Sequence, residues 1–128
     1  MTDSVFRHGD PVMVDYTPAS GNIALGDVVV LGSVTANTSG TGGFTAIAHR
    51  PITNNTLGAL AVGGGVYGMT NLNNAANGAK VYWDIQNNTR KVTTVSTNNS
   101  VFGWVVANGG GGANTTCYCL HAPFHGNA

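Results

Sequence analysis

The apolar residues of this chain fall into short stretches in which hydrophobic and polar positions alternate, or in which β-branched residues are enriched. Apolar positions do not recur at intervals of three and four residues, so the chain lacks the pattern of an amphipathic helix. Joints rich in Gly and Asn, such as residues 71–74 and 109–112, separate the stretches and are typical of turns. The pattern predicts about nine strands, at residues 12–17, 27–35, 44–48, 59–62, 65–69, 79–85, 91–96, 101–107 and 115–121.

The alternation is clearest at residues 79–84, where two large aromatic residues are adjacent. In an extended strand Val81 and Trp83 face one way, while Lys80 and Tyr82 face the other. Trp83 is therefore expected to anchor a core, and Tyr82 is expected to point outward.

These features predict an all-β fold, a small β-barrel or sandwich with flexible termini. A chain of 128 residues has the length of a single domain, and no shift in composition marks a second one. We expect the domain to span residues 9–121, preceded by an arm at residues 1–8 and followed by a tail at residues 122–128.

Both ends of the chain carry apolar or aromatic residues outside the predicted strands. Val5 and Phe6 precede the first strand, and Phe124 follows the last. Each end either docks on a neighbouring protein through these side chains or frays in solvent. Val5, Phe6 and Phe124 are therefore the candidate contact residues of an assembly.

The charge content sets this chain apart from an average soluble domain. Lys, Arg, Asp and Glu make up 8% of the residues, against about 25% in typical domains. The chain has no Glu, and its polar character comes from 15 Asn and 15 Thr, alongside 19 Gly. A neutral polar surface with net charge near zero favours association, because it repels other proteins only weakly. The composition predicts a protein that works within an assembly.

The same composition argues against two classes of partner. Nucleic-acid binding needs clustered Lys and Arg, whereas the five basic residues here are scattered except for Arg90 and Lys91. No apolar stretch reaches the length of a membrane span, and residues 1–8 lack the apolar run of a signal peptide. We therefore expect no nucleic-acid or membrane partner, and folding in a cytoplasm.

One cluster of residues has the composition of a metal site. Alternation places Cys117, Cys119 and His121 on one face of the last predicted strand. A straight strand holds residues i and i+2 roughly 7 Å apart, which suits neither a structural zinc site nor a disulfide. Two buried core thiols are the favoured interpretation, and a site shared between subunits is the alternative.

Other motifs give weaker indications of chemistry. The Gly-x-Gly-x-x-Gly run at residues 63–68 is followed by a turn-like sequence instead of a helix, so it does not predict a dinucleotide site. The pairs His8 with Asp10 and His49 with Arg50 are interpreted as solvated turn residues, and the chain has no nucleophile elbow. The sequence predicts no catalytic residues, no cofactor and no metal site.

Four sequence blocks occur in a familiar order: Gly-Asp-Pro-Val at 9–12, Ala-Leu-Gly-Asp-Val-Val at 24–29, Gly-Ala-Lys-Val-Tyr-Trp-Asp at 78–84 and Val-Phe-Gly-Trp-Val at 101–105. In this order they resemble the bacteriophage capsid cement, or head decoration, proteins, and the resemblance extends over about residues 9–121. Members of that family have also been labelled phage recombinases. The chain has no phosphate-binding loop, which argues against that label. It departs from the family in its glycine loops at 40–43 and 109–112 and in the Cys-x-Cys-x-His strand.

The resemblance implies a structural virion protein that binds the outer surface of the mature phage capsid and stabilises contacts between major capsid protein subunits. Its partners would be the major capsid protein and further copies of itself, as a homotrimer. No catalysis is implied. Through Val5 and Phe6 the arm is expected to contact the capsid or a neighbouring subunit, so deleting residues 2–7 should weaken binding and leave the fold intact.

Two other functions are compatible with the sequence. A tail-associated or fibre-associated β-module that binds host glycan or another virion protein would use exposed aromatic residues, for which Tyr67, Tyr82 and Trp104 are candidates. A small hydrolase would use His49 or His121.

Overall fold

The computed structural model describes residues 3–32 and 44–124, and these residues form ten β-strands. The strands are β1 (Ser4–Gly9), β2 (Met13–Tyr16), β3 (Val28–Leu31), β4 (Phe44–Ala48), β5 (Gly58–Ala61), β6 (Gly65–Thr70), β7 (Lys80–Trp83), β8 (Val92–Thr93), β9 (Ser100–Ala107) and β10 (Thr116–His121). The described residues contain no helix. The all-β prediction is therefore confirmed.

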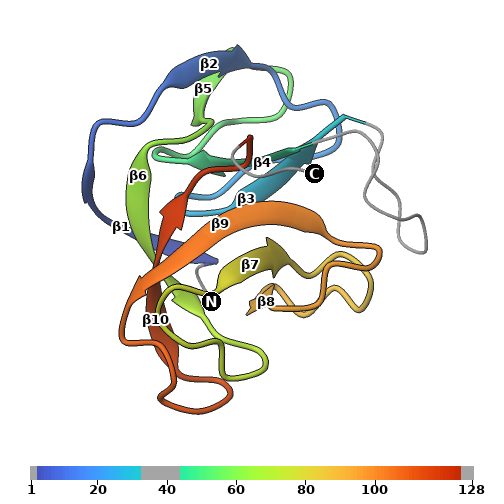
Figure 1. Ribbon diagram of the computed structural model, residues 1–128. Helices are drawn as coiled ribbons and strands as arrows, with labels where there is room; N and C mark the ends of the chain where they lie inside the picture. The colour runs from blue at the N-terminus through green and yellow to red at the C-terminus, as the bar shows by residue number, and fades with distance from the viewer. Residues whose placement is uncertain (1–2, 33–43, 125–128) are drawn as a thin grey trace.

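The strands form two separate sheets (Figure 1). Six strands pair in the order β1-β6-β10-β9-β7-β8, and four pair in the order β2-β5-β4-β3. The pairings between these strands are antiparallel, and none of those given by the described residues closes either sheet into a barrel. In the part of the chain that the structure describes, no helix could cross a bilayer.

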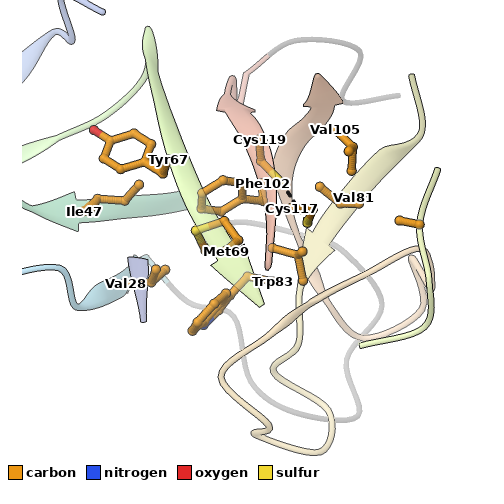
Figure 2. Close-up of a cluster of buried hydrophobic side chains, with 12 residues drawn as sticks. Val28, Ile47, Tyr67, Met69, Val81, Trp83, Phe102, Val105, Cys117 and Cys119 are labelled. Atoms are coloured by element: carbon orange, nitrogen blue, oxygen red, sulfur yellow. Dashed lines mark hydrogen bonds between the residues drawn. The ribbon is translucent and has the colours of Figure 1, made fainter. Parts of the chain in front are cut away.

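The main core lies between the two sheets. Alternation along β10 and β7 turns Cys117, Cys119, Val81 and Trp83 inward, where the exposed fraction of each side chain is 3% or less. From the four-stranded sheet, Val28 and Ile47 complete the same cluster, which Figure 2 shows around Tyr67, Met69 and Phe102. The prediction that Trp83 anchors the core and Tyr82 points outward agrees with this arrangement.

A second, smaller core lies on the other face of the four-stranded sheet. It contains Ala46, Ala48 and Leu60, and it is closed by Ile52 from the loop between β4 and β5. Gly58 makes room for this contact, because a Cβ at position 58 would overlap the Ile52 side chain. The four-stranded sheet is therefore packed on both faces.

The nine predicted strands all have counterparts, most of them shorter than predicted. The strand predicted at 27–35 is observed as β3 over Val28–Leu31, and the last three predicted residues lie outside the described part of the chain. The tenth strand, β1, was not predicted. It occupies most of the segment that was expected to be an arm, so the expectation of a flexible amino terminus does not hold from residue 4 onward.

Candidate interaction surface

The most exposed large apolar side chains are concentrated near the start of the chain. Of the ten that stand out among the described residues, five lie between residues 5 and 14. We call these five the N-terminal flank: Val5, Phe6, Val12, Met13 and Val14. Val5 and Val12 are the extreme cases, with 60% and 65% of their surface exposed. Clustered exposed apolar side chains mark a candidate protein interface.

The flank is built from two edge strands. β1 is the last strand at one edge of the six-stranded sheet, and β2 is the last strand at one edge of the four-stranded sheet. The chain passes from one to the other along the left margin of Figure 1. An edge strand carries backbone N–H and C=O groups that no neighbouring strand satisfies, so it is open to pairing with a partner. A β-bulge at Arg7 interrupts the regular register of β1.

The two predicted contact residues on β1 point to opposite sides of the strand. The Phe6 ring packs against His49 and Tyr67, with ring centroids 4.7 and 5.4 Å apart. Val5 points to the outer face of the six-stranded sheet, beside Arg7. Val5 and Phe6 therefore serve two different surfaces that meet at one edge.

Phe124 belongs to another part of the molecule. Its ring packs against Phe44, the first residue of β4, with centroids 4.9 Å apart, and 61% of its surface stays exposed. Phe6 instead lies against His49, just beyond the last residue of β4. The structure thus separates Phe124 from the N-terminal flank by the length of β4. Residues 125–128 of the predicted tail lie outside the described residues.

The start of β1 is anchored instead of free. Ser4 donates both its backbone N–H and its hydroxyl to the carbonyl of Gly26, at 3.1 and 2.8 Å. The Asp3 carboxylate, which is 4% exposed, accepts a hydrogen bond from the Val28 N–H and forms an ion pair with Arg90. Deleting residues 2–7 would remove these contacts and four of the six residues of β1, so we now expect such a deletion to destabilise the fold instead of sparing it. Residues 1 and 2 lie outside the described part.

His121 joins the two sheets through Thr45 of β4. Its Nε2 lies 3.1 Å from the Thr45 carbonyl oxygen, which only accepts, so Nε2 carries the proton. The Thr45 hydroxyl lies 2.9 Å from the same nitrogen, while Nδ1 has no partner among the described residues. Burial lowers the pKa of His121 to about 4. His121 is therefore neutral at pH 7, and it is fully enclosed.

His49 makes a second link between the sheets. Its Nε2 lies 2.6 Å from the hydroxyl of Tyr67, a residue of β6 with no exposed surface. Burial lowers the pKa of His49 and raises that of Tyr67. Both predicted hydrolase candidates, His49 and His121, thus have positions and partners that fasten β4 to the six-stranded sheet.

The cysteines lie where alternation predicted, on the inner face of β10. Their Sγ atoms are 3.7 Å apart, and both side chains are fully buried (Figure 2). The hydrogen bond with Cys117, together with burial, raises the pKa of the Cys119 thiol. No group of three His, Cys, Asp or Glu side chains suited to a metal ion occurs within the described residues, so His121 does not join the two thiols in a ligand set.

The aromatic residues proposed for glycan binding are not equivalent. Tyr67 is buried and points into the core. Tyr82 and Trp104 are half-buried on the outer face of the six-stranded sheet, where the Lys80 amine lies 5.6 Å from the Tyr82 ring centroid. The burial of Tyr67 therefore excludes a glycan site formed by all three residues together.

The structure describes one of the two glycine loops in which the chain departs from the family that it resembles. The loop at 109–112 packs against the turn at 74–77, because the Gly109 and Gly112 amides each donate to an Asn side chain of that turn, Asn77 and Asn74, at 2.7 Å. The loop at 40–43 lies outside the described residues. The Gly-x-Gly-x-x-Gly run at 63–68 leads into β6, as its sequence context indicated.

Part of the N-terminal flank, and the Asp3–Arg90 ion pair that anchors it, could not be predicted from the sequence. Val12, Met13 and Val14 were assigned to the strand predicted at 12–17, and the structure leaves all three exposed, with Met13 and Val14 on the short edge strand β2. The Asp3–Arg90 pair spans 87 positions and has no local sequence signal. The nearest signal for the flank was the run of apolar residues after Gly9-Asp10-Pro11.

Comparison with known proteins identifies the family but adds no close relative. No curated protein and no solved structure shows a significant similarity to this chain. The sequence profile of the family described as phage cement protein matches residues 6–120, which include nearly all of the ten strands. The chain therefore belongs to the phage cement protein family.

Proposed function

We propose that this protein binds the outer surface of the mature phage capsid and stabilises contacts between major capsid protein subunits. Membership of the phage cement protein family supports a structural role in the virion and a location on its capsid. The observation that carries the proposal is the N-terminal flank, which holds half of the most exposed large apolar side chains among the described residues, along two adjacent sheet edges. Such a surface is suited to a protein partner.

The composition supports the same proposal. A surface built from neutral Asn and Thr can hydrogen-bond to a neighbouring subunit without the desolvation penalty that buried ions carry. We further propose that the protein assembles as a homotrimer in the host cytoplasm before it binds. One oligomer that touches several capsid subunits gains avidity well above that of any single contact.

The test compares two pairs of valine substitutions. Val12→Thr with Val14→Thr makes the flank polar, while Val95→Thr with Val106→Thr changes two valines of similar exposure elsewhere. Purified phage heads that lack this protein are mixed with each variant, and bound protein is measured by cosedimentation. We expect the flank variant to bind at least about tenfold more weakly and the control to bind like the unmodified chain. Equal binding by the two variants would refute a role for the flank.

Copy number separates the cement role from the tail-associated alternative. Quantitative mass spectrometry of purified virions gives the ratio of this chain to the major capsid protein. A ratio near one to one is expected if the protein covers the head. A few copies per particle would instead place it on the tail or at a vertex.

A further inference from the structure

A groove runs over the outer face of the six-stranded sheet, next to the N-terminal flank. It has a volume of about 280 Å³ and is formed by β1, β6 and β10. Val5 and Arg7 form one wall, Tyr118 and Thr116 form the other, and Asp3 lies at one end. The groove therefore lies directly inside the sheet edge that β1 forms.

The absence of a side chain at position 68 creates the groove. Val5 of β1 and Tyr118 of β10 both lie opposite Gly68 of β6, so two large side chains flank a glycine floor. Small-molecule sites occupy roughly 300–1,000 Å³ and enclose most of their ligand. A smaller, open groove beside a sheet edge fits one side chain of an extended partner segment better than a free ligand.

The two charged side chains that line the groove, Asp3 and Arg7, differ in whether they already have an ion-pair partner. The Asp3 carboxylate is already paired with Arg90 and accepts the Val28 N–H. The Arg7 guanidinium lies over the Tyr118 ring, 4.3 Å from its centroid, and no described carboxylate forms an ion pair with it. The groove thus presents one fixed positive charge that an acidic group of a partner would neutralise.

We propose that this groove receives an acidic side chain from an extended segment of the major capsid protein, with Arg7 as its ion-pair partner. The inference rests on the proposed function and specifies where the capsid segment lies. The segment runs alongside β1, where its backbone is within reach of the unpaired edge, and Val5 contacts its apolar part. Stacking on Tyr118 holds the guanidinium in place, so less side-chain freedom is lost on binding.

Two independent variants test the groove. Arg7→Gln removes the charge. Gly68→Val fills the floor: a Cβ at position 68 would lie 3.4 Å or more from Tyr118 and Thr116, and urea unfolding of the variant checks that the fold is kept. Lys91→Gln is the matched charge control beside β8, at the opposite edge of the sheet, and Val106→Ile adds bulk to the same outer face outside the groove.

Binding of each full-length variant to heads that lack this protein is measured at several salt concentrations. We expect Arg7→Gln and Gly68→Val each to weaken binding about tenfold or more, and the affinity of Arg7→Gln to fall less steeply with salt than that of the unmodified chain. The two controls should bind normally. If the unmodified chain binds and both groove variants bind equally well, the groove inference is overturned while the proposed function stands. If the unmodified chain itself fails to bind, both are overturned.

Discussion

His121 is the residue whose protonation state is most tightly tied to the fold. The folded chain takes up this proton only near pH 4, whereas a histidine in the unfolded chain does so near pH 6.5. Between these values the unfolded state binds more protons, so stability falls as the pH is lowered through this window and loses nothing further below it. The difference corresponds to about 3 kcal/mol.

We therefore predict that the free energy of unfolding of the unmodified chain drops by up to about 3 kcal/mol between pH 7 and pH 4 on account of His121. Urea unfolding at several pH values measures this. In His121→Gln the side chain stays neutral, so its unfolding free energy should depend less on pH, while His49 contributes equally to both proteins. Parallel pH profiles for the two proteins would contradict the assignment.

Gly68 and Gly103 lie on β6 and β9, the two strands that flank β10, and should respond differently to the same substitution. A Cβ at Gly103 would overlap the carbonyl oxygen of Leu120, a backbone atom that cannot move aside, whereas a Cβ at Gly68 meets only ordinary contacts. We predict that Gly103→Ala costs about 3 kcal/mol or more or prevents folding, and that Gly68→Ala costs less than about 1 kcal/mol. Soluble yield and urea unfolding compare the two, and similar losses would be inconsistent with this packing.

At the scale of single residues, the sequence could predict which way a side chain points but not which residue it contacts. Alternation correctly turned Cys117, Cys119 and His121 inward, because strand periodicity is a local property. It could not pair His49 with Tyr67 or His121 with Thr45, since those contacts join different sheets. Tyr67 was consequently taken for an exposed aromatic residue.

Among the elements, strands with at least one buried face were the easiest to predict from the sequence. β4 was predicted over the same residues that the structure shows, because four of its five residues are buried and Gly and Pro flank the run in the sequence. β1 was missed because its residues from Val5 to Gly9 are exposed on both faces, so its sequence has no alternation to detect. The strand predicted at 91–96 shrinks to the two residues of β8, since most of its remaining positions are exposed.

The clamp formed by Asp3 and Arg90 holds the start of β1 against both sheets. Arg90 also donates to the carbonyl oxygen of Val28 in β3 and lies over the Trp83 ring of β7. We predict that Asp3→Asn lowers the free energy of unfolding by about 2 kcal/mol, as expected for charge-assisted hydrogen bonds to a buried carboxylate. Urea unfolding of Asp3→Asn, Arg90→Asn and the double variant gives the coupling energy. Additive losses would mean that the two side chains act independently.

For the whole molecule, low charge and the exposed flank favour self-association. We predict a homotrimer with about three times the 13.0 kDa mass of one chain, and we expect salt to change this mass little, because few ions are available to be screened. Light scattering coupled to size-exclusion chromatography measures it. Val12→Thr with Val14→Thr shows whether the flank is used between copies, since a monomeric variant would assign the flank to the trimer. A monomer at all concentrations of the unmodified chain would remove the trimer from the proposal.

The passage of one continuous segment from the edge of one sheet to the edge of the other has a mechanical consequence. A load that enters at residues 5–14 is divided at once between β1, which is bonded to β6, and β2, which is bonded to β5. Tension along β1 also pulls on the Ser4 hydrogen bonds and on the Asp3–Arg90 ion pair, which together anchor the start of the strand. If the N-terminal flank binds the capsid as we propose, a shell that swells from within would load both sheets of this subunit at once instead of pulling on one sheet alone.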